Sequence, residues 1–338
     1  MIPRVTVIID SYNYGQYIEE ALDSVLSQDF AANQFEVIVV DDGSTDDTSD
    51  RVRKYGSRVQ YLFKPNGGQA SAFNLGFSHA RGEIVALLDA DDYWLPGKLK
   101  LIVAEFDKNP EVGMVYHRLL EFNTVAGTRI DASFTPISGR VCDNRRDLLS
   151  YILYPTSALA FRRNFITPLL PIPEALTIQA DAHLAGLIIF LAPIVAVNEA
   201  LAVYRIHGKN LFHAPGVKSD LQRIQRRLDT RKVLIGDMQG WLVGHGWDLS
   251  EPDLQALVMQ WQLTQEEDEF HIDPPGRGRL FRHLWQHNKY FRPRLSSRHI
   301  AFNYARALAS LILGYSNLNK FDDWHRYSRR LRGRVSNA

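Results

Sequence analysis

Asp89, Asp91 and Asp92 stand almost side by side in the sequence, directly after the apolar run 84–88. Neighbouring carboxylates raise one another's pKa, whereas a hard divalent cation relieves their repulsion and takes oxygen ligands by preference. We therefore interpret this acidic cluster as a site for a metal ion and a diphosphate at the end of a strand. The alternative is an acidic turn that only caps the following helix.

Three further polar clusters follow apolar segments upstream. The segments 4–9, 35–40, 58–63 and 84–88 are apolar, β-branched or aromatic, and they are predicted to be strands. The polar residues after the first three are Asp10 to Asn13, Asp41 and Asp42, and the loop from Lys64 to Gln69. Helix caps need one polar residue per loop, so paired acids in two loops favour a binding site.

Segments with helical periodicity separate these strands. The alternation predicts a doubly wound, mainly parallel α/β sheet of the Rossmann type, in which ligands bind beyond the carboxyl ends of the strands. All four polar clusters are therefore expected at one edge of the sheet. Ser44 and Asp47 also have the spacing of a capping box that opens a helix.

The chain of 338 residues has the composition of an ordinary globular protein, 45% hydrophobic and 23% charged. The single cysteine, Cys142, excludes a disulfide framework and favours a reducing compartment. The longest apolar run, 184–197, is too short to span a bilayer and is read as core. We predict an α/β domain over 1–214 and a helical extension over 215–338. Helices are expected within the extension at 221–234, 254–269 and 299–313.

The residues expected at this edge of the sheet could together bind a nucleotide sugar. Tyr12 could stack beneath a nucleobase, and Asp41 could accept a hydrogen bond from an N–H group of that base. Asp89 and Asp91 could hold a metal that neutralises the charge on a departing nucleoside diphosphate. Each residue also has a structural interpretation, Asp41 as a helix-capping acid and Tyr12 as a core aromatic.

Four ordered motifs carry a resemblance to a known family. They are VTVIIDSYNYGQYIEEALDSVLSQ, FEVIVVDDGSTDDT, KPNGGQASAFNLGFSHARGEIVALLDADDYW and, much later, AVYRIHGKN. The chain resembles the inverting glycosyltransferases of family 2, which have the GT-A fold, closely over 4–105 and loosely over 106–210. The resemblance implies a uridine- or guanosine-diphosphate sugar donor, Mg²⁺ or Mn²⁺ as cofactor, and inversion at the anomeric carbon. It also implies nucleotide binding in 1–105 and an acceptor side in 106–214.

The family pattern gives the polar residues of the first domain their expected roles. The residues at positions that bind or approach the donor are Tyr12, Asn13, Asp41, Asp42, Lys64, Gln69 and Asp89. Asp89 and Asp91 are the two acids of the DxD motif, of which the last usually binds the metal, and Asp92 follows as a supporting acid. Asp10 stands where many members have proline and Phe73 where arginine is frequent, which leaves the donor's identity open.

An inverting displacement needs a general base for the proton of the acceptor hydroxyl. The family supplies it from an acidic pair at the start of a later helix, and the match here is Ala180-Asp181, with the first acid missing. We choose Asp181 as the base, and capping of the helix is its structural alternative. His207 matches a position near the diphosphate and the metal, with a structural hydrogen-bonding role as the alternative.

Charge is distributed unevenly along the chain. The segment 276–338 carries 14 Lys and Arg against only Asp322 and Asp323, a balance of +12, whereas the residues before it carry −11. Aromatic and apolar residues lie between these basic residues, as in helices that bind an anionic membrane surface. The alternatives are a solvated face, an oligomer contact or a nucleic-acid patch. No nucleic-acid module is recognised, so nucleic acid is not expected.

We therefore predict a metal-assisted inverting hexosyltransferase that moves a sugar from a nucleoside-diphosphate sugar to a hydroxyl of a glycan or lipid-linked acceptor, as in the biosynthesis of cell-envelope polysaccharides. A cytoplasmic location is expected, with peripheral contact to the inner face of the membrane as an open option. One alternative is a sugar-phosphate nucleotidyltransferase, which needs a glycine-rich phosphate loop where this chain has DSYNYGQ. Another is a non-catalytic nucleotide-sugar-binding protein, which Ala180 and Phe73 motivate.

Overall fold

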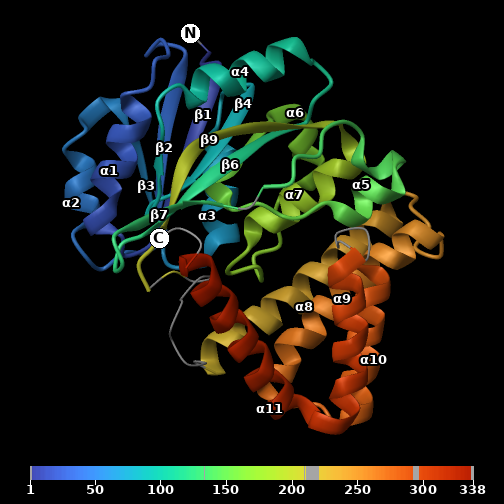
Figure 1. Ribbon diagram of the computed structural model, residues 1–338. Helices are drawn as coiled ribbons and strands as arrows, with labels where there is room; N and C mark the ends of the chain where they lie inside the picture. The colour runs from blue at the N-terminus through green and yellow to red at the C-terminus, as the bar shows by residue number, and fades with distance from the viewer. Residues whose placement is uncertain (1, 133, 209, 211–220, 292–296, 336–338) are drawn as a thin grey trace. The chain divides into compact units, whose positions relative to one another are not determined.

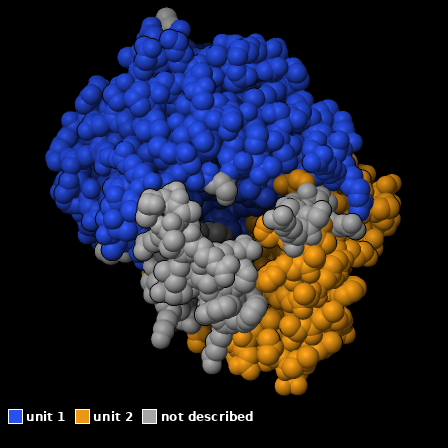
Figure 2. All heavy atoms as spheres, in the orientation of Figure 1, with its two compact units in different colours: residues 1–147, 151–218, 236–238 blue, residues 148–150, 219–235, 239–338 orange. Residues whose placement is uncertain are grey.

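The computed structural model describes residues 2–132, 134–208, 210, 221–291 and 297–335, with backbone alone at 297, 298 and 319–335. The chain divides into two compact units, coloured separately in Figure 2. Unit 1 comprises Met1–Asp147, Tyr151–Lys218 and Gly236–Met238, and unit 2 comprises Leu148–Ser150, Ser219–Ile235 and Gln239–Ala338. The predicted boundary after residue 214 lies outside the described residues.

Unit 1 is built on one mixed sheet, in the order β3-β2-β1-β4-β8-β6-β9-β5, with β7 paired to β6 (Figure 1). The strands are β1 (Val5–Ser11), β2 (Phe35–Asp41), β3 (Gln60–Phe63), β4 (Ile84–Asp89), β5 (Tyr93–Trp94), β6 (Met114–Asn123), β7 (Thr128–Asp131), β8 (Leu159–Arg162) and β9 (Ile194–Ile206). Strands β1 to β4 run parallel, and β8 runs antiparallel to β4 and β6. The predicted doubly wound sheet is confirmed for this first half.

Helices connect the strands and bury their apolar faces on the sheet. They are α1 (Gly15–Leu26), α2 (Thr48–Arg53), α3 (Gln69–His79), α4 (Lys98–Lys108), α5 (Arg145–Ser150), α6 (Arg163–Ile166) and α7 (Ala180–Leu191). In α1 the buried residues Ile18, Leu22 and Val25 recur at helical spacing. Helix α7 is buried almost all round, because residues 184–191 of the apolar run 184–197 lie in this helix. The end of the run forms the start of β9.

The strand register brings the polar clusters to one level. Ser11 lies opposite Asp41, Asp10 lies opposite Asp89, and Asp41 lies opposite Phe63, which directly precedes Lys64. The carboxyl ends of β1, β2, β3 and β4 therefore meet at one edge of the sheet, as the alternation of strands and helices predicts.

The predicted capping box at Ser44 is wrong. Helix α2 begins only at Thr48, and its N-cap residue Asp47 makes no capping hydrogen bond with its side chain. The Ser44 hydroxyl instead accepts a hydrogen bond from the Asn13 backbone N–H, at 2.8 Å. A contact between two loops of the binding edge thus replaces the local cap.

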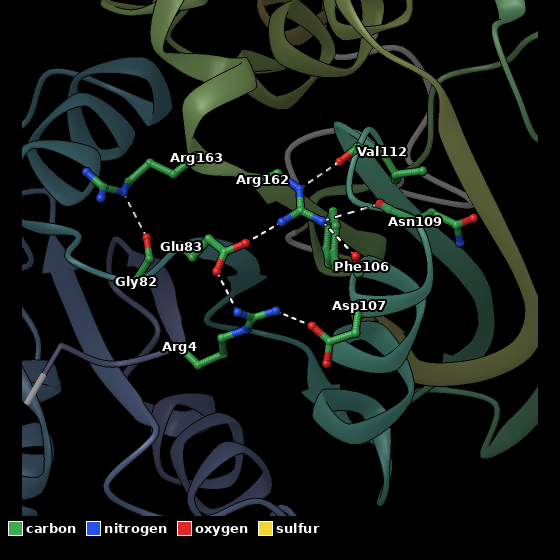
Figure 3. Close-up of polar contacts among 9 residues, drawn as sticks. All are labelled: Arg4, Gly82, Glu83, Phe106, Asp107, Asn109, Val112, Arg162 and Arg163. Carbon is green, nitrogen blue, oxygen red and sulfur yellow. Dashed lines mark hydrogen bonds and ion pairs between the residues drawn. The ribbon is translucent and has the colours of Figure 1, made fainter.

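A network of polar contacts joins several elements at the other end of the sheet, away from the carboxyl ends of β1 to β4 (Figure 3). The buried Arg162 guanidinium, at the end of β8, pairs with Glu83 and donates to the carbonyl oxygens of Phe106 at 2.7 Å and Val112 at 3.2 Å. Arg4 also pairs with Glu83, at 2.6 Å, and with Asp107 of α4. These contacts join the amino ends of β1 and β4 to β8 and α4, so they hold the sheet from the end away from the polar clusters.

Unit 2 is helical and comprises most of α8 (Leu221–Gly244) together with α9 (Pro252–Ile272), α10 (Arg277–Tyr290) and α11 (Ser297–Val335). Helix α10 was not predicted from the sequence. The three helices that were predicted in this part of the chain are present and are longer than expected. Phe270, Leu280, Leu284 and Ala307 belong to the buried apolar cluster of this unit. None of the described helices combines the length and apolar character that crossing a bilayer requires.

Candidate active site

The acidic cluster converges in space as well as in sequence. One carboxylate oxygen each from Asp89, Asp91 and Asp92 lies within 4.8 Å of the others. Burial raises the pKa of Asp89 and of Asp92 well above the ordinary value, and the charges of neighbouring aspartates, Asp10 and Asp91 among them, raise it further. Three carboxylates this close together supply hard oxygen donors, a donor set that fits a divalent cation such as Mg²⁺ or Mn²⁺.

Asp91 is oriented by residues from two distant segments. Its Oδ2 accepts from His207 Nε2 at 2.9 Å and lies 3.4 Å from Asn210 Nδ2. The His207 ring stacks on Tyr17 with centroids 4.9 Å apart. Burial raises the pKa of the Tyr14 hydroxyl near Asp91, and the charges of the neighbouring aspartates raise it further. His207 thus contacts the acidic cluster through Asp91.

Asp92 is bound by the protein on both oxygens. It is fully buried, and it accepts from the Ser157 hydroxyl at 2.6 Å and from the Arg205 backbone N–H at 2.9 Å. The Ser157 hydroxyl also accepts from the Asp89 N–H at 3.2 Å. Asp92 therefore ties the turn after β4 to β9 and to the segment before β8, which agrees with a supporting role.

The loops expected to hold the nucleobase are tied to each other. Tyr12 is 47% exposed, so its ring is accessible to a ligand. Asn13 accepts from the Thr45 N–H at 2.8 Å and thereby fixes the two loops. Asp41 is fully buried and accepts from the Ser44 N–H at 2.7 Å and the Tyr61 hydroxyl at 2.6 Å. Each of its oxygens retains a lone pair, but contact with a base requires access that this conformation does not provide.

Asp42 and Lys64 bind each other and shape the loop before α3. The Lys64 ammonium donates to Asp42 Oδ1 at 2.6 Å. The same carboxylate accepts from the backbone N–H groups of Gly67 at 2.9 Å and Gly68 at 2.7 Å. The two charges compensate each other within the loop, so they position the loop that approaches the donor site.

Asp181 is linked to the acidic cluster through two side chains. Gln69 Nε2 lies 3.4 Å from Asp89 Oδ1 and 3.3 Å from Thr156 Oγ1. The Thr156 hydroxyl donates to Asp181 Oδ2 at 3.0 Å. Gln69 Oε1 accepts from the Ala180 N–H at 3.0 Å, so Gln69 also holds the first turn of α7. Burial raises the pKa of Asp181, and hydrogen bonds from Thr156 and Ala182 oppose the shift.

Several residues of the site were not predicted. Those that bind or adjoin the predicted aspartates are Asp10, Tyr14, Thr156, Ser157, Arg205 and Asn210. Asp10 was visible as a departure from the family pattern. Tyr14, Arg205 and Asn210 lie within two of the quoted motifs, but nothing in those motifs assigned them a contact. Thr156 and Ser157 act through hydroxyls at positions that no local pattern marks.

The comparisons with known proteins agree with this geometry. A family model described as Glycosyl transferase family 2 matches residues 6–167. The chain belongs to this family. An uncharacterized glycosyltransferase of Nostoc sp. is 38% identical over 220 residues, which cover 61% of this chain and 66% of that relative. The family match and this relative identify the protein as a glycosyltransferase.

Solved structures share the fold at low sequence identity. The Staphylococcus aureus TarS fragment 1–349 in complex with UDP-GlcNAc aligns with a TM-score of 0.62 and 19% identity, over 96% of this chain and 92% of that one. The mannosyltransferase PcManGT of Pyrobaculum calidifontis, in complex with GDP-Man and Mn²⁺, aligns with a TM-score of 0.55 and 21% identity, over 97% and 85%. The predicted GT-A fold is confirmed.

Proposed function

We propose that this glycosyltransferase transfers a hexosyl group from a UDP- or GDP-sugar to a hydroxyl of a glycan or lipid-linked acceptor, with inversion and with the help of Mg²⁺ or Mn²⁺. The observation that carries the proposal is the bridge Gln69–Thr156, which connects the acidic cluster to Asp181. The nucleotide sugars and the Mn²⁺ in the structures of TarS and PcManGT support the choice of donor and cation.

The donor half of the site is formed by residues at the carboxyl ends of the strands. Asp89 and Asp91 would hold the cation, whose charge offsets the charge that develops on the departing nucleoside diphosphate. His207 orients Asp91 through its hydrogen bond of 2.9 Å, or itself supplies a ligand. Tyr12 offers its exposed ring to the base, while Asn13, Asp41, Asp42 and Lys64 set the loops around the nucleotide.

Asp181 is the proposed general base. As the acceptor oxygen bonds to the anomeric carbon, the bond to the diphosphate breaks on the opposite face, and Asp181 takes the hydroxyl proton. Its raised pKa makes the carboxylate a stronger proton acceptor than an exposed aspartate. The Thr156 hydrogen bond fixes the carboxylate in orientation. Gln69 Oε1 accepts from the Ala180 backbone N–H, so this contact holds the first turn of α7 next to the proposed base.

The Asp181→Asn variant tests the proposal. We expect transfer to fall about 10²–10⁴-fold, the usual contribution of a general base, while binding of the donor stays within experimental error. A single-turnover assay measures transfer, and calorimetric titration with the nucleotide sugar measures binding. Glu174→Gln is the matched control, because Glu174 is the other nearby acid of this segment and is exposed. An active Asp181→Asn enzyme would refute the assignment.

The proposal includes the compartment in which the enzyme acts and the kind of synthesis to which it contributes. A single cysteine favours a reducing compartment, so we propose a cytoplasmic enzyme of polysaccharide or cell-envelope synthesis. The family membership removes the nucleotidyltransferase alternative. Transfer from any member of a panel of nucleotide sugars separates the enzyme from a non-catalytic binding protein.

A further inference from the structure

Helix α11 carries apolar side chains on an exposed face as well as on its buried face. Ala301, Ala305, Leu308 and Ile312 recur at helical spacing and form one exposed stripe. Leu308 is 55% exposed and Ile312 is 76% exposed, whereas Ala307, on the opposite face, is fully buried. An exposed apolar stripe of this kind marks a surface that binds another apolar phase.

Helix α10 continues this stripe with a basic and aromatic face. Arg282, Trp285 and Lys289 follow one another at spacings of three and four residues, and all three are exposed. The Trp285 ring, 43% exposed, packs against Tyr304 of α11 with centroids 4.7 Å apart. The aromatic pair therefore joins the basic face of α10 to the apolar stripe of α11. We call the six residues Arg282, Trp285, Lys289, Tyr304, Leu308 and Ile312 the α10–α11 surface.

Acidic residues are absent from this part of the sequence. No Asp or Glu occurs between Asp273 and Asp322, so the positive charges of Arg282 and Lys289 have no acidic neighbours along the chain. A second copy docked through the same surface would bring like charges together without acids to pair them. Nucleic acid would use the basic residues but would leave Leu308 and Ile312 without an apolar partner.

We propose that the α10–α11 surface binds an anionic lipid bilayer. Leu308 and Ile312 enter the boundary between headgroups and acyl chains, Trp285 and Tyr304 lie at headgroup level, and Arg282 and Lys289 contact the lipid phosphates. The contact is peripheral, which agrees with the finding that no described helix can cross a membrane. The inference concerns where the enzyme is held and is independent of the proposed donor, base and cation.

Vesicle flotation of the full chain tests the proposal. The probes are vesicles of phosphatidylcholine with and without phosphatidylserine, at low and at high salt. We expect binding to the vesicles that contain phosphatidylserine, weakened by salt because the exposed charges are screened. No binding to these vesicles at low salt would overturn the proposal.

Matched variants locate the contact. Leu308→Gln with Ile312→Gln, and separately Arg282→Gln with Lys289→Gln, are expected to lower the vesicle-bound fraction roughly tenfold or more, since apolar burial and each basic residue contribute independently. Val243→Gln is the control, because Val243 is an apolar helical residue that is 59% exposed outside this surface. Circular dichroism checks that each variant is folded.

Two further results would contradict the assignment. Equal vesicle binding by wild type and both double variants would place the contact elsewhere. A wild-type dimer in light scattering that becomes monomeric in the Leu308→Gln, Ile312→Gln variant, together with unchanged vesicle binding, would identify the surface as a contact between copies of this chain.

Discussion

Asp10 is the last but one residue of strand β1 and lies beside Asp89 of β4. Among the described residues, no donor reaches its buried Oδ1. Burial raises the pKa of Asp10 to about 7, the contact with Asp89 opposes this shift, and the charges of Asp91 and Asp181 add to it. The folded protein therefore binds a proton at Asp10 at pH values where the unfolded chain has already released it, so folding stability falls as pH rises through this range.

Asp10→Asn is expected to stabilise the protein at pH 8 without metal. The amide cannot ionise, so the variant avoids the cost of a buried carboxylate, on the order of 1–3 kcal/mol, since each pKa unit corresponds to about 1.4 kcal/mol. The advantage should shrink towards pH 5, where wild-type Asp10 is protonated in the folded state. Urea unfolding in EDTA at pH 5 and pH 8 measures the difference in free energy of unfolding between the variant and wild type. A difference that does not change with pH would contradict the assignment of a raised pKa to Asp10.

Asp91 is the residue on which cation binding is expected to depend most. Wild type should be stabilised against heat by UDP or GDP together with Mn²⁺, and much less by the nucleotide in EDTA. Asp91→Asn should lose the metal-dependent part of this shift. Asp143→Asn, an exposed acid outside the site, is the control. Equal stabilisation in EDTA would argue against Asp89 and Asp91 as metal ligands.

Among the elements, the loop between β3 and α3 is tightly constrained. Asp42 accepts from the N–H groups of Gly67 and Gly68. Gly68 has φ +85, and an added Cβ would lie 2.6 Å from the Thr177 Cα. Next to it, the Gln69 N–H donates to the Thr177 carbonyl at 3.1 Å. The loop can approach the segment before α7 this closely only because Gly68 has no side chain.

Gly68→Ala is expected to destabilise the protein by several kcal/mol and to weaken donor binding, because the clash is with backbone and Gln69 must move. Gly56→Ala is the matched control: its φ is +57, but a Cβ there meets nothing within 4 Å. Gly56→Ala should therefore show only the strain of the positive φ, about 1 kcal/mol. Urea midpoints compare the two, and equal losses would show that the close approach does not matter.

Across the whole molecule, α8 contributes residues to both compact units. Gly236–Met238 belong to unit 1, while the rest of this continuous helix belongs to unit 2. His183 of α7 and Asp237 of α8 lie 2.9 Å apart within unit 1. Because α8 is one continuous helix with residues in both units, we predict that the two units unfold together.

If the two units unfold together, a ligand that binds unit 1 should also raise the melting temperature of unit 2. Five of the six tryptophans lie in unit 2, so tryptophan fluorescence mainly follows that unit. Mn²⁺ with UDP or GDP should raise the melting temperature seen by fluorescence as much as that seen by circular dichroism. The Asp91→Asn variant should show neither shift. Separate transitions, with only the circular dichroism signal moved, would show that the units unfold independently.

The first half of the fold could be predicted because the sequence patterns that specify it are local. Apolar strand segments, helical periodicity and paired acids after strands are read within windows of a few residues, and parallel connection places all the strand ends at one edge. The sequence also predicted the acidic cluster, which the structure brings together. The roles of Tyr12, Asn13 and the other donor-binding residues remain predictions.

Only the tertiary structure decided how the site is held together. Ser157 reaches Asp92 across 65 residues, Gln69 reaches the Ala180 N–H across 111, and His207 reaches Asp91 across 116. These contacts use a hydroxyl, an amide, an imidazole and a backbone group, and no periodicity distinguishes such groups from solvent-exposed ones. Burial is encoded by local composition, but the choice of polar partner depends on which segments the packed sheet brings within hydrogen-bonding distance. The sequence by itself therefore determined the acids and their sheet edge, and the packing decided which residues orient them.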